Sequence, residues 1–285
     1  MTIASRICWL LGLTVLPSLF LPSCQGFAQT TKSIYAPWAH HTVEVNPVIR
    51  PRRNVMLSMA TPDILTLSRD ITISDPALEE VYRSSFAIID ACSVSGKPTE
   101  NLYDAVRAID KNAGKLYPSI EDKEALWERC HGSWQLQLAT GGGKFTTFKP
   151  IPHPLFTFAV IDETDFGNGI GVSLFGGRGS DNILLALRGP HDFLAQRRQM
   201  IIGIDDMFLW RGSFRVTESL PGFIKDGMGL GKRKEDFKKT KQRPPAFTMI
   251  AASEKSLIAR GGTGGIAIWT RMDHDIRPLA YGDSK

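Results

Sequence analysis

The side chains best suited to acid–base chemistry in this sequence are the adjacent carboxylates of Asp205 and Asp206. Neighbouring strand residues point to opposite faces, so one of the two would face an interior if a strand runs through them. A buried carboxyl group there could serve as a general acid or base. Gly203 and the change of pattern around it favour a bulge or turn instead. We therefore expect no catalytic residue, and an enzyme that uses one of these acids stays open as the alternative.

Other polar motifs do not have the spacing that their chemistry requires. The run at 141–144 (GGGK) is followed by Phe145, where a phosphate-binding loop needs Ser or Thr. The glycines of 261–265 lack the strand-to-helix setting of a dinucleotide site, and the acids of 162–165 do not follow the calcium-loop spacing. The six histidines form no i, i+4 ligand pair. We expect neither a metal nor a cofactor, and a solvated hairpin tip at 162–165.

A basic segment at 225–243 holds eight Lys or Arg residues against three acids. Pro, Gly and scarce β-branched residues predict a loop there. Its bases suit an anionic lipid surface, whereas the few aromatic residues disfavour a groove for nucleic acid. A solvated insertion without a partner is the alternative. The predicted membrane-surface residues are Lys232, Arg233, Lys234, Lys238, Lys239 and Lys241.

The chain of 285 residues is 42% hydrophobic and 22% charged, which is ordinary globular composition. Its net charge of +5 comes mostly from residues 1–60, which hold five bases and one acid. Residues 1–26 resemble a signal peptide, because fifteen largely apolar residues at 7–21 follow Arg6. Residues 27–60 are basic and poor in acids, as transit segments are. Together they predict a bipartite presequence for plastid import.

Two alternatives to plastid import remain at the N-terminus. The apolar run could be a tilted membrane anchor, although Pro17 and Pro22 interrupt it. The chain could also be secreted with a disordered arm. Loss of the presequence would leave only Cys92 and Cys130, which is not a disulfide framework, and their redox state stays open.

The remaining sequence predicts an α+β fold: a helical lead-in at 61–131, followed by an antiparallel β-barrel domain at 132–285. Asp75-Pro76, Thr99 and Ser119 can each start a helix. From Trp134 onward the hydrophobic period changes to two. Strand-like runs follow at 155–161, 170–175, 183–188, 198–204, 207–214, 246–252 and 266–271, with a further short piece at 257–259. Asn168-Gly169 and Gly176-Gly177 are predicted turns.

Two stretches carry a resemblance to a known family. Gly132-Ser133-Trp134 at the start of the first strand resembles the entry of lipocalin-like barrels, in which the indole plugs the closed end. With the C-terminal stretch 253–271 and the helical lead-in, the chain resembles the plastid lipid-associated protein (fibrillin) family. Glu254, Arg260 and Gly265 fit that family's ending, whereas Leu257 and Ala259 depart from it. Only the two ends of this resemblance, which spans about 75–271, are specific.

The resemblance implies a lipocalin-like barrel, without catalysis, that binds or organises apolar lipids, isoprenoids or carotenoids at thylakoids or plastoglobules. The alternatives are a lipocalin-like isomerase or de-epoxidase and a structural coat of lipid bodies. An eight-stranded barrel can hold one small ligand, or its side chains can simply fill it. The candidate ligand-binding residues are Trp134, Leu136, Leu138, Phe156, Phe158, Met200, Ile202, Phe208 and Trp210. For closure of the barrel we predict Gly132 and Trp134, with Arg260 packed over the indole and Arg271 as second candidate.

Overall fold

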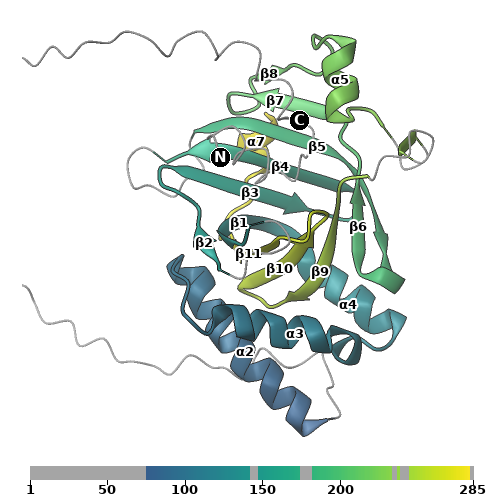
Figure 1. Cartoon of the computed structure of the whole chain (residues 1–285). Coiled ribbons are helices and arrows are strands. Elements are labelled where there is room, and N and C mark those ends of the chain that lie inside the picture. Colours follow the sequence, from purple (N-terminus) through teal and green to yellow (C-terminus); the bar gives the residue numbers. More distant parts are fainter. Residues whose placement is uncertain (1–74, 142–146, 174–181, 233–235, 238–243, 283–285) are drawn as a thin grey trace, which may run out of the picture.

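A computed structural model of the chain describes residues 75–141, 147–173, 182–232, 236–237 and 244–282. The fold is α+β and consists of helices followed by a closed antiparallel barrel (Figure 1). The predicted presequence segments 1–26 and 27–60 lie outside the described residues, as do residues 61–74 of the helical lead-in and Gly176-Gly177.

Three helices precede the barrel in the sequence: α2 (Pro76–Ser95), α3 (Leu102–Leu116) and α4 (Ile120–Cys130). Helix α2 starts where Asp75 accepts a hydrogen bond from a first-turn backbone N–H, and it ends at Gly96, whose φ of 65° is left-handed. Helix α4 starts with a capping box between Ser119 and Asp122. The predicted cap of α3 is wrong, because Asn101 and not Thr99 occupies the N-cap position.

Eight antiparallel strands form the ring, in the spatial order β4 (Asp165–Val172), β3 (Leu155–Ile161), β1 (Gly132–Ala139), β11 (Ile266–Arg271), β10 (Ser256–Gly261), β9 (Ala246–Ala252), β6 (Gln199–Ile202) and β5 (Ile183–Leu194). Strand β5 pairs with β4 and so closes the ring. The short strand β2 (Lys149–Pro150) pairs with β1 outside it. The barrel predicted from the period-two segments is therefore present.

The ring has one long excursion, between β6 and β9. Strand β5 pairs with β6 along its second half and with β7 (Asp206–Leu209) along its first, so β6 and β7 act as one strand interrupted at 203–205. The interruption lies at the predicted bulge. A hairpin then leads to β8 (Phe214–Arg215) and to α5 (Gly222–Met228), a short helix that the sequence pattern did not predict.

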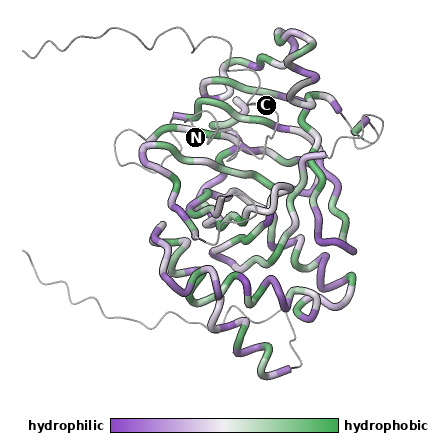
Figure 2. The backbone as a smooth tube through the Cα atoms, viewed as in Figure 1, coloured by the Kyte–Doolittle hydropathy of each residue, from purple (hydrophilic) through white to green (hydrophobic). Residues whose placement is uncertain are grey.

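Helices α2, α3 and α4 gather on one side of the barrel, and β7, β8 and α5 lie on the opposite side (Figure 1). The three helices alternate hydrophilic and hydrophobic stretches along their length (Figure 2), as expected for helices with one buried face. Polar contacts also join the helices to the barrel: the hydroxyl oxygens of Ser93 and Ser256 lie 2.6 Å apart, and Ser253 donates to Asp90.

Two expectations about β4 were wrong. The predicted strand at 170–175 starts at Asp165, and Asn168-Gly169 lies in mid-strand instead of forming a turn. Asn168 pairs with Ala159 on one neighbouring strand and with Leu187 on the other, so β4 has a strand partner on each side at this position. The glycines of this strand therefore have a packing role.

A C-terminal helix, α7 (Arg277–Tyr281), lies against the outside of the barrel. It was not predicted, because five residues are too few to show a helical period. Ile276, Ala280 and Tyr281 are buried there in a second apolar cluster, together with Phe158 and Phe208. The barrel wall therefore has an apolar covering on its outer face as well as an apolar interior.

Candidate functional site

One end of the barrel is closed around Trp134, near the start of β1. The indole Nε1 donates a hydrogen bond to the carbonyl of Cys130 at 2.7 Å, and the side chain is fully buried. The guanidinium of Arg271 lies over the ring, with its central carbon 4.1 Å from the ring centroid. It also donates to the carbonyl oxygens of Arg129, His131 and Glu254, each at 2.8 Å. Arg271 thus joins the end of α4 to the barrel.

The closure prediction for Arg260 is wrong, and Arg271, the second candidate, occupies the place over Trp134. Register explains the difference, because Trp134 pairs directly with Arg271 across β1 and β11. Arg260 points to the other face, where it forms an ion pair with Asp110 of α3. Gly132 lies beside the closure: its φ is 127°, and a Cβ there would lie 2.6 Å from a guanidinium nitrogen of Arg271. A side chain at this position would displace the arginine.

Helix α4 seals the same end. Its Trp127 stacks on Phe193 of β5, with ring centroids 4.5 Å apart and planes 10° apart. The imidazole rings of His131 and His191 each lie edge-on to the indole of Trp127, with ring centroids 5.0 Å apart. Partial burial is the main cause that lowers the pKa of His131, so the imidazole is neutral at neutral pH. The closed end is therefore filled by aromatic side chains.

Four of the predicted ligand-binding residues face the inside of the barrel and belong to the main apolar cluster: Trp134, Leu136, Met200 and Ile202. Ala159 pairs with Trp134, and Leu187 lies on the same face further around the ring. All of these side chains are buried. The interior near the closed end is thus apolar and packed.

The other five predicted ligand-binding residues do not line the interior: Leu138, Phe156, Phe158, Phe208 and Trp210. After a bulge in β1, Leu138 pairs with Ile268, on the face where Arg260 meets α3. Trp210 lies in the turn after β7 and is exposed. The three phenylalanines are buried on the outer face, in the cluster that α7 covers.

Alternating glycines on β4 explain the outward phenylalanines. A Cβ at Gly169 would lie 2.5 Å from the ring of Phe158, and one at Gly171 would lie 2.3 Å from the ring of Phe156. The rings thus lie flat across positions where only glycine leaves room. The Gly-x-Gly-x-Gly pattern at 167–171, opposite Phe156 and Phe158, was the signal in the sequence that could have identified this face.

The strand ends opposite to Trp134 form the mouth of the barrel. Leu185 lies there; it is partly buried and packs against the main cluster. Phe247 is also partly buried, but its ring centroid lies 6.2 Å from that of Phe166, whose partner Ile161 pairs with Gly132 at the closed end. Ala267 pairs with Ala139 at the end of β1, and it too is partly buried. Inward-facing apolar side chains thus continue to this end of the barrel, where Leu185 and Ala267 are partly buried.

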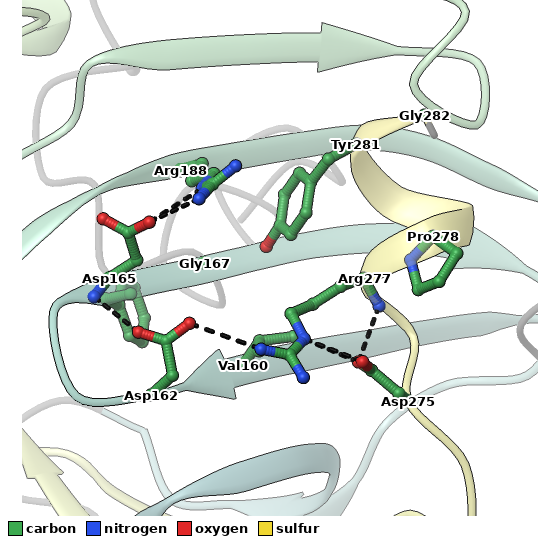
Figure 3. Close-up of a pocket in the computed structure, with 11 residues that line it drawn as sticks. Val160, Asp162, Asp165, Gly167, Arg188, Asp275, Arg277, Pro278, Tyr281 and Gly282 are labelled. Carbon is green, nitrogen blue, oxygen red and sulfur yellow. Dashed lines mark hydrogen bonds and ion pairs between the residues drawn. The ribbon is translucent and has the colours of Figure 1, made fainter. Parts of the chain in front are cut away.

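A pocket of about 280 Å³ lies on the outer face, between β3, β4, β5 and α7 (Figure 3). Its charged residues are three carboxylates and two guanidinium groups, and each guanidinium group is bound to a carboxylate. Arg188 binds Asp165, and Arg277 binds Asp275 at 2.8 Å and Asp162 at 3.5 Å. Asp162 also accepts backbone hydrogen bonds from the β3–β4 turn, so the predicted solvated tip at 162–165 contributes to an ion-pair cluster.

Tyr281 lies between the two arginines in this pocket, with Arg188 5.6 Å from its ring centroid (Figure 3). Burial raises the pKa of Tyr281 well above its usual range, so the hydroxyl group stays protonated. The hydroxyl lies against Gly167, where a Cβ would come within 1.6 Å of it. Because the carboxylates are bound by arginines and the hydroxyl is buried, the arrangement fastens α7 to the barrel wall.

The acid considered for catalysis also has a structural partner. Asp206 accepts from Arg215 at 2.8 Å and from the Thr217 hydroxyl at 3.4 Å. Its strand register pairs it with Arg188, whose side chain lies on the outer face. The carboxylate of Asp206 therefore points away from the barrel interior, while Asp205 lies in the interruption between β6 and β7.

Of the predicted membrane-surface residues, the structure describes only Lys232. Its ammonium group donates to the backbone carbonyl of Asp226 at 2.9 Å and lies 4.0 Å from that residue's carboxylate. Lys232 is thus held locally. The other five, Arg233, Lys234, Lys238, Lys239 and Lys241, lie outside the described residues.

The fold defines a closed, eight-stranded antiparallel barrel with a helical layer, an architecture compatible with binding a hydrophobic ligand. No protein-family model matches the chain, and no curated protein is significantly similar to it. Among the described residues, no helix has both the length and the apolar character needed to cross a bilayer.

Proposed function

We propose that this chain is a non-catalytic, lipid-associated protein of plastids that holds an apolar lipid, isoprenoid or carotenoid at its barrel. The observation that carries the proposal is a closed barrel with an apolar lining that is sealed at one end. Trp134 and α4 seal that end, whereas Leu185 and Ala267 lie partly buried toward the other. An acyl or isoprenoid tail that enters there gains about 0.8 kcal/mol per buried methylene.

Residues 1–60 support the plastid part of the proposal, because a signal-like segment followed by a basic, acid-poor segment is typical of bipartite import. The resemblance to fibrillins at the Gly132-Ser133-Trp134 entry and at the C-terminal strands supports the lipid part. The non-catalytic part is supported by Asp206, whose carboxylate is engaged by Arg215 and Thr217 on the outer face.

Uptake of cis-parinaric acid by the delipidated full chain tests the binding function. We expect a saturable rise in probe fluorescence with one site per chain. Leu185→Gln places an amide at the mouth and should weaken uptake by about tenfold, the equivalent of roughly 1.4 kcal/mol. Val94→Gln, at an exposed position of α2, is the matched control and should leave uptake unchanged.

Two results would overturn the binding proposal. One is an absence of saturable uptake by the delipidated, folded chain. The other is equal weakening by Leu185→Gln and Val94→Gln, which would place the probe on the general surface and not at the mouth.

A further inference from the structure

Exposed aromatic side chains collect on the excursion between β6 and β9. Among the described residues, the large apolar side chains with the most exposed surface include Trp210 at 64%, Phe214 at 61% and Phe223 at 67%. Leu209, which pairs with Phe214 across the β7–β8 hairpin, is 37% exposed. We call residues 209–223 the aromatic edge. It lies on the side of the molecule opposite to α2, α3 and α4 (Figure 1).

The turn that carries Trp210 has a defined conformation. Trp210, Arg211 and Gly212 have consecutive left-handed φ values of 53°, 59° and 71°. The first two donate backbone hydrogen bonds to β5, to the carbonyls of Leu184 at 3.1 Å and Ile183 at 2.9 Å. A Cβ at Gly212 would lie 2.0 Å from the backbone nitrogen of Gly282, so the C-terminal segment packs closely against the turn. The fold thus holds an exposed indole in a conformation that non-glycine residues rarely adopt.

Charge indicates the kind of surface that would cover these rings. Arg211 is exposed at the tip of the turn. Helix α5, which carries Phe223, overlaps in sequence with the segment 225–243, which holds eight bases and three acids. Indole and phenyl rings favour the headgroup region of a bilayer, and an adjoining excess of bases favours anionic lipids. A protein partner would not require this combination.

We propose that the aromatic edge is a membrane-docking surface, with Trp210, Phe214 and Phe223 inserted at the headgroup level of an anionic bilayer. This docking goes beyond ligand binding at the mouth and does not require the barrel to be occupied. It gives the basic segment a partner, with the apolar anchor adjoining that segment in sequence. Docking by this side would leave the helical layer α2–α4 facing away from the lipid.

The test is co-sedimentation of the full chain with mixed vesicles of phosphatidylcholine and phosphatidylglycerol. Trp210→Asn removes the ring but suits the left-handed backbone, because Asn tolerates that region. We expect this variant, combined with Phe223→Ser, to lower the partition coefficient by about tenfold or more at both low and high salt. Lys238→Ser with Lys239→Ser should weaken binding mainly at low salt. Val94→Asn, which removes an equally exposed side chain on α2, should have no effect.

Two controls separate this proposal from its alternatives. Urea unfolding must show that the Trp210→Asn, Phe223→Ser chain is folded, and its uptake of cis-parinaric acid should equal that of the original chain. Vesicle binding that is unchanged in this variant would overturn the docking proposal, whatever the result for the barrel ligand. A loss of self-association on gel filtration with vesicle binding intact would also overturn it, because the edge would then be a contact between copies of the chain.

Discussion

Replacing Arg271 by Lys tests how the barrel is closed. Lysine keeps the positive charge but replaces a planar group with three hydrogen bonds by a single ammonium group. In the structure, the guanidinium reaches the carbonyls of Arg129, His131 and Glu254 and lies 4.1 Å above Trp134. An ammonium group at the end of one flexible chain can hold one of these acceptors in place of three.

The expected cost follows from these contacts. Two lost hydrogen bonds cost about 1 kcal/mol each, since the carbonyls of Arg129 and His131 lie at the partly buried junction between α4 and the barrel. Weaker stacking over the indole adds about 0.5–1 kcal/mol. We therefore expect Arg271→Lys to lower the free energy of unfolding by roughly 3 kcal/mol. Urea unfolding of the full chain, followed by far-UV circular dichroism at neutral pH, measures this value.

Arg260→Lys is the matched control, because the same substitution is made on the neighbouring strand. Arg260 and Asp110 keep side-chain exposures of 38% and 29%, so their ion pair is close to solvent. Such a pair contributes at most about 1 kcal/mol. A loss below about 1 kcal/mol for Arg271→Lys, or an equal loss for the two variants, would refute the assignment of Arg271 to the closure.

Two further perturbations test the attachment of α7 to the barrel wall and the sealing of the closed end by α4. Gly167→Ala should cost about 1–3 kcal/mol locally by displacing Tyr281, and so speed chymotrypsin cleavage after Tyr281 by about tenfold. Gly262→Ala, whose added Cβ would have 3.9 Å of clearance, should not change the rate, and equal rates for the two variants would exclude the role of Tyr281 in fastening α7. Because the pKa of His131 is lower in the folded chain than in the unfolded one, its contribution to stability is complete above about pH 6.5 and falls as the pH drops towards the folded value. His131→Gln should therefore flatten the decline of the urea midpoint between neutral and acidic pH relative to His274→Gln, and parallel profiles would contradict this.

Local signals in the sequence predicted the elements well. Asp75 and the Ser119–Asp122 box start helices in the structure, because capping depends on residues within one turn. The closed barrel followed from period-two segments and the need to hide strand edges. These features depend on neighbours in sequence, or on a pattern that every strand repeats.

Features that depend on register were not predictable in the same way. Arg260 and Arg271 both lie on the last two strands, and only the pairing of Trp134 with Arg271 decides which one covers the indole. Phe156 and Phe158 alternate as inward-facing residues would, but α7 buries the outer face and makes both faces apolar. Where both faces of a strand are buried, the alternation of its residues does not show which face is the barrel interior. The glycines at 167, 169 and 171 do show it, because aromatic rings lie against them on the outer face.

The packing of the two aromatic clusters limits where the barrel can hold a ligand. Trp134, Trp127 and Phe193 fill the closed end, and the outward phenylalanines are covered by α7. An apolar tail bound as proposed would therefore enter at the end of Leu185 and Ala267, with any polar group left at the mouth. Because the depth available ends at Trp134, lengthening the tail beyond that point adds no buried methylene and no affinity. A series of fatty acids of increasing length should thus show affinity that rises and then levels off, whereas adsorption to the open surface would rise throughout.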